Sequence, residues 1–300
     1  MRFSIWPLAS QDWGELLATA RHASETGWDG VWIADHFMGG GGAIPEDSPT
    51  LEAGSLVAAL AAAVPRVRIG TLVYGNTYRH PAVVAKMAAT VDQVSGGRFT
   101  LGLGTGWQQN EHDQYGIELP PPAERVDRFE EAIQIVSSLL REPRTTFDGR
   151  HYRIRDALCE PKPVQEPLPI LLGGSGDRML RIAARHADGW NTWGLPDRIA
   201  ERSTTLTRAC EQVGRDPGAI ARTAQALVFL MDDVAAADRL VEQLPMPTMA
   251  GPPERLRDVV AAYAEIGLDE LIVPDRTLGE GDVRLATMDR FIEDVAAGFR

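Results

Sequence analysis

Short apolar runs alternate along this chain with longer segments in which apolar residues recur every three or four positions. The short runs have the length and β-branched composition of buried strands, and the longer segments have the period of helices. Alternation of this kind predicts a parallel sheet built from repeated strand and helix units. Eight strands are predicted, at residues 3–6, 31–34, 67–73, 99–104, 170–172, 189–193, 221–230 and 270–273.

Segment 124–141 is the clearest of the predicted helices. Its apolar residues follow one another at spacings of three and four, so they share one face, while Glu and Arg occupy the other. No Gly/Ser-rich linker and no change in composition divides the chain. The pattern therefore predicts one domain, residues 1–300, folded as a single (β/α)8 TIM barrel, and two doubly wound domains are the alternative.

Three insertions interrupt the regular alternation. Segment 37–50, after the second predicted strand, contains the glycines Gly39 to Gly42 and is expected to form a mobile lid. Segment 107–122, after the fourth strand, is polar. Before the fifth strand, Asp148-Gly149 separates two short strand-like runs over 145–154, which predicts a hairpin with a two-residue type I′ turn. Loops that follow strands lie on the active face of a barrel, so the first two insertions should face the site.

Composition narrows the class of function. Lys and Arg number 30 against 42 Asp and Glu, a net charge of −12, which argues against sequence-independent binding to nucleic acid or an anionic membrane surface. No stretch reaches the roughly 18 apolar residues of a membrane span. The two cysteines, Cys159 and Cys210, form no CxxC motif, so neither a disulfide framework nor a structural zinc site is indicated, and a reducing cytoplasm is expected.

The sequence from Gly173 to Asp177 is the clearest candidate for binding a phosphate. It follows the fifth predicted strand and precedes the helical run 179–187. Backbone N–H groups at such a junction face an anion, the glycines allow close approach, and the helix adds the positive end of its dipole. A plain turn capped by Ser175 or Asp177 is the alternative. A Walker A lysine and a G-x-S-x-G elbow are both missing, so neither a nucleoside triphosphatase nor a hydrolase triad is supported.

A second glycine cluster, spaced G-x-G-x-G over residues 102–106, ends the fourth predicted strand. It runs into the polar segment 108–115, interpreted as irregular, and so does not open a helix as a dinucleotide fingerprint must. The glycines are expected to let a flat ring lie against the backbone, with Thr105, Trp107 and Asn110 as walls. The alternative is a strand that simply ends in a turn.

Asp35 and His36 end the second predicted strand. A histidine there can act as an acid or a base near neutral pH, but neighbouring strand residues point to opposite faces, so Asp35 need not contact it, and a strand-end cap is the alternative. The run Glu111-His112-Asp113 is expected to form solvated loop surface. These five residues together would make a metal-dependent barrel hydrolase, a different class of protein, yet no histidine pair has the spacing of metal ligands.

In their order along the chain these motifs resemble the luciferase-like monooxygenase superfamily, and within it the branch that uses the deazaflavin coenzyme F420. The resemblance covers nearly the whole chain. The segments that carry it are Gly27 to Phe37 (GWDGVWIADHF), 78–92 (YRHPAVVAKMAATVD), 95–98 with 101–107, 173–176 with 187–191, and 267–274 (GLDELIVP).

The resemblance implies a flavin-type ring at the C-terminal face of the barrel, against the third and fourth strands, with its phosphate at Gly174 to Asp177. It implies a bulge with a non-proline cis peptide near Leu72-Val73, and it places His36 beside the reactive ring as the catalytic residue. The implied set includes no metal ligand. The implied cofactor contacts are Asp35, His36, Leu72, Val73, Asn76, Thr105, Gly106, Trp107, Gly173, Gly174, Ser175, Gly176 and Asp177.

Two positions refine the resemblance. The sugar-phosphate dehydrogenases of this branch have a glutamate proton donor directly after the residue that matches Gly106, where this chain has Trp107. The flavin-dependent luciferases have Glu-His-His where this chain has Asp35-His36-Phe37. The first difference puts sugar-phosphate chemistry in doubt, and the second favours F420 over FMN.

The sequence therefore predicts a cytoplasmic, F420-dependent oxidoreductase that transfers a hydride to or from a small organic substrate. Its lid, 37–50, would exclude water, and His36 would give acid-base help. The alternatives are an FMN-dependent monooxygenase supplied by a separate flavin reductase, and a flavin-binding protein without catalysis. The family resemblance also implies a homodimer, whereas the substrate and the direction of transfer stay open.

Overall fold

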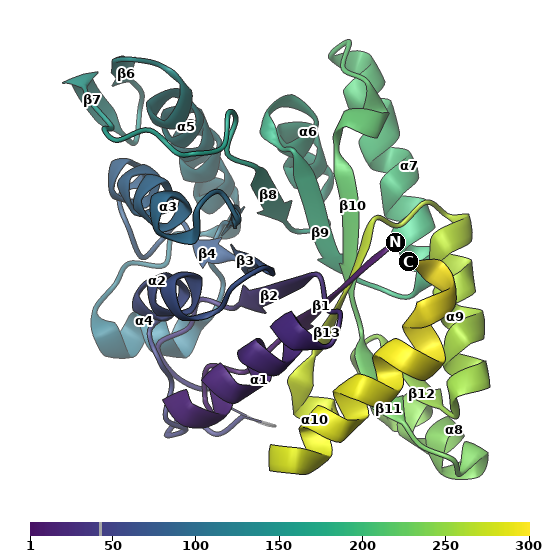
Figure 1. Ribbon diagram of the computed structural model, residues 1–300. Coiled ribbons are helices and arrows are strands. Elements are labelled where there is room, and N and C mark those ends of the chain that lie inside the picture. The colour runs from purple at the N-terminus through teal and green to yellow at the C-terminus, as the bar shows by residue number, and fades with distance from the viewer. Residues whose placement is uncertain (42–43) are drawn as a thin grey trace.

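The protein is a closed barrel of parallel strands surrounded by helices, described here by a computed structural model that covers residues 1–41 and 44–300 (Figure 1). The strands run in the order β3-β2-β1-β13-β10-β9-β8-β5, and pairing of β3 with β5 closes the ring. This confirms the predicted (β/α)8 barrel, and each of the eight predicted ranges contains or overlaps one barrel strand. The barrel strands are β1 (Arg2–Trp6), β2 (Gly30–Ile33), β3 (Arg68–Thr71), β5 (Phe99–Gly104), β8 (Ile170–Gly173), β9 (Gly189–Trp193), β10 (Ala221–Gln225) and β13 (Glu270–Pro274).

Helices follow the strands and cover the outside of the barrel (Figure 1). Within the described ranges, no helix combines the length and the apolar character needed to cross a bilayer. The helices are α1 (Trp13–Glu25), α2 (Ala53–Ala63), α3 (Pro81–Ser95), α4 (Gln109–Tyr115), α5 (Pro122–Arg141), α6 (Asp177–His186), α7 (Pro196–Gln212), α8 (Val234–Gln243), α9 (Pro253–Glu265) and α10 (Gly281–Arg290).

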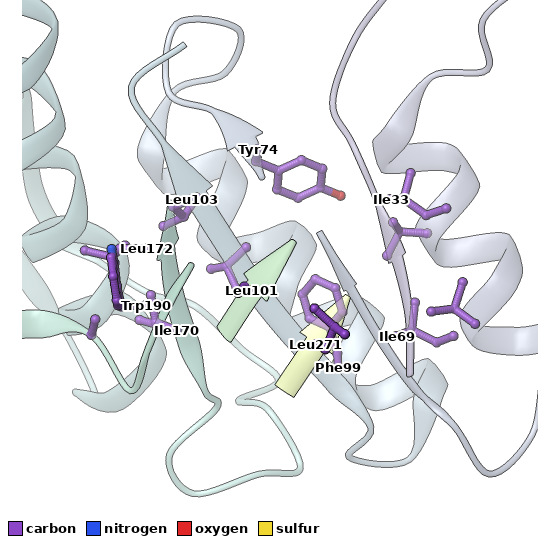
Figure 2. Packing of buried hydrophobic residues seen from close by; sticks show 14 of the residues in the cluster. Ile33, Ile69, Tyr74, Phe99, Leu101, Leu103, Ile170, Leu172, Trp190 and Leu271 are labelled. Atoms are coloured by element: carbon purple, nitrogen blue, oxygen red, sulfur yellow. The ribbon is translucent and has the colours of Figure 1, made fainter. Parts of the chain in front are cut away.

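Strand residues alternate between the helix layer and the barrel interior, as the two-residue period of a strand requires. The outward residues join the large core between strands and helices, of which Figure 2 shows Ile33, Leu101 and Leu172. A separate cluster, formed by Trp32, Leu72, Leu171 and Ile272, fills the interior. The interior is therefore packed, and chemistry is left to the ends of the strands.

A buried carboxylate closes the N-terminal end of the barrel. Glu270, at the start of β13, accepts hydrogen bonds from Ser4 Oγ at 2.6 Å, Trp32 Nε1 at 2.8 Å and Arg68 Nη2 at 2.9 Å. Because a buried charge needs such partners, we infer that this end of the barrel stabilises the fold and does not bind a ligand.

Two of the predicted strands are divided. Strand 67–73 ends at Thr71, passes through the expected cis peptide at Leu72-Val73, and resumes as β4 (Tyr74–Gly75), which pairs with β5. The predicted strand 221–230 is wrong as one element, because only β10 belongs to the barrel. The chain continues as β11 (Leu227–Leu230), which pairs in parallel with β12 (Thr248–Gly251) as a separate sheet.

The predicted hairpin is present, but its turn is wider than predicted. Strands β6 (Thr145–Asp148) and β7 (Arg153–Ala157) are antiparallel, and Asp148 pairs with Arg153, so four residues connect them. The cause lies on α5, where the Glu131 carboxylate accepts hydrogen bonds from the N–H groups of Arg150, His151 and Tyr152. Three charge-assisted bonds stabilise the wider loop over a type I′ turn.

Candidate active site

His36 stands just beyond β2 with one ring nitrogen bound to a buried carboxylate. Its Nδ1 lies 2.9 Å from Glu111 Oε1. Glu111 is fully buried and also accepts hydrogen bonds from the hydroxyl of Tyr78 and from the N–H of Phe37. Three donors thus satisfy one carboxylate at the end of β2.

The expectation that Glu111, His112 and Asp113 form solvated loop surface is wrong for two of the three. Segment 108–115 is not irregular, because it contains the helix α4, which turns Glu111 and His112 inward while Asp113 stays exposed. Buried His112 bonds to the carbonyl of Gln108 and to Thr77 Oγ1. Within residues 1–41 and 44–300, no group of His, Cys, Asp and Glu side chains is arranged to hold a metal ion.

The electrostatics of this network assign the proton on His36. Burial acts to raise the pKa of Glu111, but the bonds from His36, Tyr78 and Phe37 outweigh it and lower that pKa, so the carboxylate is ionised at neutral pH. Burial and the Glu111 charge raise the pKa of Tyr78, which keeps its proton. Because Glu111 is then only an acceptor, Nδ1 of His36 is the donor, and Nε2 has no hydrogen-bond partner among the described residues.

The side chain of Asp35 makes no hydrogen bond to His36, because its carboxylate is bound to Arg79 and Gly75. It is 3% exposed, forms a bidentate ion pair with Arg79 at 2.6 and 2.9 Å, and accepts the N–H of Gly75 at 2.9 Å. Burial raises the pKa of Asp35, and the Arg79 guanidinium acts against that rise. The carboxylate thus fastens β4 and the start of α3 to the end of β2.

The bulge after β3 fills the space beside the strand glycines. A Cβ placed on Gly104 would lie 2.6 Å from Val73 Cγ2, and one on Gly173 would lie 3.0 Å from the same atom. A Cβ on Gly102 would collide with the carbonyl of Thr71. These glycines therefore admit the bulge itself, which corrects the expectation that the glycines of β5 lie open to a flat ring.

The turn from Gly174 to Gly176 joins β8 to α6 and offers free backbone donors. Gly176 is the N-cap and has no side-chain cap bond, so capping by Ser175 or Asp177 is not observed. The N–H groups of Ser175, Gly176 and Asp177 have no hydrogen-bond partner within the described ranges. The Asp177 carboxylate is paired with Arg202 of α7, which offsets its charge. The turn matches the geometry expected of an anion site.

The remaining predicted residues gather where β4 and β5 end. The N–H of Asn76 donates to the carbonyl of Gly104 at 2.9 Å, which brings Asn76 beside Thr105 and Gly106. Trp107 is 67% exposed, and its ring stands edge-on to the His36 ring with centroids 5.6 Å apart. Trp107, which stands where the family resemblance implies a glutamate, therefore lies next to the ring of His36.

Sequence reasoning missed several residues at the same face. Tyr78 and Arg79 were quoted only as part of a family motif, although they bind Glu111 and Asp35. Trp6 and Trp193 end β1 and β9, with ring centroids 5.8 Å apart, and Trp6 Nε1 is buried without a hydrogen-bond partner in the described part of the chain. Their signal is positional, because each is the last inward residue of its strand.

Comparisons with known proteins place the chain among the members of one family. A family model described as luciferase-like monooxygenase matches residues 1–251. An F420-dependent glucose-6-phosphate dehydrogenase of Microbacterium testaceum is 38% identical over 198 residues, which cover 64% of this chain and 56% of that protein. Its namesake from Beutenbergia cavernae is 30% identical, with 95% of this chain and 93% of that protein covered.

Solved structures show the same fold. An F420-dependent secondary alcohol dehydrogenase in complex with an F420-acetone adduct matches with a TM-score of 0.85. The match covers 99% of this chain and 98% of that one at 19% sequence identity. At that sequence identity the match shows a shared fold and nothing about function.

Proposed function

The chain belongs to the luciferase-like monooxygenase family, and from this premise we propose that it is an F420-dependent oxidoreductase acting on a small organic substrate. The relatives named as F420-dependent dehydrogenases support this proposal. The observation that carries it is the pairing of His36 with buried Glu111 at the C-terminal end of the barrel, beside the cis-peptide bulge. This arrangement places one proton-accepting nitrogen beside the strand ends where barrel enzymes bind their ligands.

The residues present fit the coenzyme. The N–H groups from Ser175 to Asp177, which have no partner in the part of the chain that the structure describes, stand at the start of α6 and are suited to its phosphate. The ring would lie beyond the bulge at Leu72 and Val73, bordered by Asn76, Thr105, Gly106 and Trp107 on one side and by His36 on another. When bound, F420 supplies the hydride carrier, and the protein supplies orientation and acid-base help.

His36 is proposed to move the proton that accompanies hydride transfer. Ionised Glu111 holds the proton of the neutral ring on Nδ1, so Nε2 accepts a proton from the mouth or, once protonated, returns it. The side chain of His36 is 29% exposed, so Nε2 can reach a ligand while Nδ1 stays anchored. Trp107 covers one side of the ring and limits the access of water.

The substrate is proposed to be a small organic molecule rather than a sugar phosphate. Trp107 stands where the related sugar-phosphate dehydrogenases have a carboxylate, which leaves His36 as the acid-base group on this side of the mouth. At the ends of β1 and β9, the rings of Trp6 and Trp193 lie 5.8 Å apart and add apolar surface to the mouth. Such a mouth favours an apolar body with one reacting polar group.

Titration of the purified protein with F420 and with FMN, followed by absorbance, tests the choice of cofactor. We expect F420 to bind at least about tenfold more tightly than FMN, a difference of about 1.4 kcal/mol. A protein that prefers FMN would instead be the monooxygenase alternative, served by a separate flavin reductase. Binding of neither compound would contradict the proposal.

Two further properties belong to the same proposal. We propose that the protein is a homodimer, as the family resemblance implies, and light scattering after size-exclusion chromatography measures its mass. We also propose that it acts in the cytoplasm with an F420 reductase as its supplier. The two cysteines, Cys159 and Cys210, are buried and unpaired, which fits a reducing compartment.

A further inference from the structure

A cavity of about 280 Å³ lies beside the candidate site, outside the ring of strands. It is bounded by the segment from Asn76 to His80, by the first turns of α5, and by Tyr152 of the hairpin loop. Its wall is shared with the site, because Tyr78 of this wall also bonds to Glu111, the partner of His36. A molecule in the barrel mouth could therefore reach into the cavity with a side arm.

Three arginines line this cavity, and two of them, Arg79 and Arg128, are paired with carboxylates, whereas Arg125 is not paired within the described residues. Arg125 Nη1 donates to the carbonyl of Gly106 at 2.6 Å, yet no carboxylate in the described part of the chain lies within ion-pair distance of it. Its Nε is buried without a hydrogen-bond partner among the described residues. A half-buried arginine without a counter-ion is notable in a chain with 42 acidic residues and a net charge of −12.

Two further side chains, Tyr152 and His80, each offer the cavity a hydrogen-bond donor. The hydroxyl of Tyr152 accepts a bond from Asn76 Nδ2 at 3.2 Å, so its own proton is free to donate. His80 Nδ1 accepts the N–H of Ala82, which assigns the proton to Nε2. The one carboxylate of the wall, Glu118, is 71% exposed and is paired with Arg128. Because the charge of Glu118 is offset by Arg128, the free groups of Arg125, Tyr152 and His80 favour a ligand whose oxygens accept hydrogen bonds.

We propose that this cavity binds a carboxylate or a phosphate group of a small molecule that also occupies the barrel mouth. The chemistry is that of charge-assisted hydrogen bonds from Arg125, Tyr152 and His80 to oxyanion oxygens. The cavity is separate from the turn at Gly174 to Gly176, which offers backbone donors instead. The inference rests on the proposed function only where F420 is named as one source of the anionic group.

Isothermal titration calorimetry with inorganic phosphate and with glutarate, at constant ionic strength in chloride buffer, tests the cavity directly. We expect the wild-type protein to bind at least one of them, Arg125→Gln to bind it at least about tenfold more weakly, and Tyr152→Phe about threefold more weakly. Arg153→Gln is the matched control, because Arg153 is 79% exposed on the same hairpin. This control should bind within about twofold of wild type.

Tyr152→Phe also shows whether weaker binding by Arg125→Gln comes from a lost contact with the anion or from a disturbed loop. Arg125 anchors Gly106, so its loss can disturb the site, whereas Tyr152→Phe removes a single oxygen and leaves that anchor intact. Anion binding that is unchanged in both variants would place the anion at the turn after β8 and overturn the proposal. No binding of either anion to the wild-type protein would overturn it too.

Absorbance titration with F420 then identifies the source of the anionic group. Weaker F420 binding by Tyr152→Phe, together with competition by phosphate or glutarate, assigns the cavity to the side arm of the coenzyme. Unchanged F420 binding with lost anion binding assigns it to an acidic substrate, and both results support the cavity. Failure of F420 to bind the wild-type protein would contradict the proposed function and leave the calorimetric result standing.

Discussion

His36 reaches the barrel mouth with Nδ1 committed to Glu111, so only Nε2 can exchange a proton with a ligand. Replacing His36 with Ala or Asn should lower turnover by at least about tenfold, since general acid-base help contributes roughly 10²- to 10⁴-fold. F420 affinity should stay within a few-fold, because the contacts of the other strands remain. Steady-state kinetics and absorbance titration measure the two effects separately.

Two results would contradict this role of His36. Unchanged turnover would make His36 a structural cap at the end of β2. Loss of both turnover and coenzyme binding would mean that the ring of His36 positions the coenzyme and does not move a proton.

Glu111 is predicted to be a positioning residue that acts through His36. Glu111→Gln replaces one acceptor oxygen with an NH₂ group, so at least one of three buried donors loses its partner, at a cost of about 1–3 kcal/mol of stability. We expect turnover to fall by about three- to tenfold, and ¹⁵N spectra should show the proton of His36 moving from Nδ1 to Nε2.

Asp113→Asn is the matched control for Glu111→Gln. Asp113 lies on the same helix, α4, carries the same charge and is exposed, so its loss should leave turnover and the His36 spectrum unchanged. If Glu111→Gln lowers stability but leaves the proton of His36 on Nδ1, Glu111 is only a structural group.

The sequence placed His36 correctly at the end of a strand but could not name its partner. Glu111 lies 75 positions away, and its inward direction depends on α4, a helix of seven residues. A helix this short is not stable by itself and forms here because Glu111 and His112 find partners inside the protein. The sequence alone therefore cannot distinguish an acidic residue in a polar loop from one that a short helix turns inward.

At the scale of elements, α4 holds the described part of the loop after β2. Gln108 and Asn110 donate to the carbonyls of Met38 and Gly39, and Asn110 also bonds to Glu46. Gly42, the last of the four glycines of the predicted lid, lies outside the described residues. The role of segment 37–50 as a lid stays a prediction.

Hydrogen exchange tests the lid. Amides within 38–41 and 44–50 should exchange faster than those of the barrel strands and should become protected when F420 binds, because this loop makes few buried apolar contacts. The backbone N–H of Phe37, bound to Glu111, serves as the internal reference and should exchange slowly in both states. Full protection of the loop without ligand would contradict a gating role.

Helix α2 begins at a carboxylate that gives it a pH dependence. Glu52 accepts the N–H groups of Gly54 and Ser55 and pairs with Arg79. Partial burial acts to raise the pKa of Glu52, but these bonds outweigh it and lower the pKa from 4.5 to about 2. A lowered pKa means that the carboxylate stabilises the fold above pH 4.5, and that this stabilisation is lost as the pH falls toward 2.

Glu52→Gln should therefore destabilise the protein by about 1 kcal/mol at pH 7, a small effect because the side chain is 40% exposed and solvent screens its charge. Denaturant titrations at several pH values measure the difference from wild type, which should shrink below pH 4.5. A difference that stays constant down to pH 3 would show that packing, and not charge, is responsible.

A helix or strand could be predicted from the sequence where its apolar residues repeat with a single spacing, that of a helix or that of a strand. The strands and helix α5 follow from apolar spacing, whereas the four-residue loop of the hairpin depends on Glu131, which belongs to another element. The division of 221–230 at Ala226 also escaped the pattern, because no Gly or Pro marks the break between the mixed run of β10 (ARTAQ) and the apolar run of β11 (LVFL). Local signals give an element, and long-range partners decide where it ends.

At the scale of the whole molecule, the first and last strands of the chain are neighbours in the barrel. Strand β1 pairs with both β2 and β13, and the amino group of Met1 bonds to the carbonyl of Phe299 at 2.7 Å (Figure 1). The family model ends at residue 251, yet β13 lies beyond it and fills the gap between β1 and β10. The C-terminal segment is therefore part of the same ring of hydrogen bonds.

Closure of this kind predicts that the single domain, residues 1–300, unfolds as one unit. Tryptophan fluorescence and far-UV circular dichroism should give the same urea midpoint. Ile272→Ala, in β13, should lower the midpoint seen by both probes equally, because Ile272 is fully buried in the interior cluster with Trp32, Leu72 and Leu171 and its truncation costs about 2–5 kcal/mol. Two separate transitions, or an Ile272→Ala effect on one probe alone, would mean that the halves of the barrel fold independently, as in the two-domain alternative.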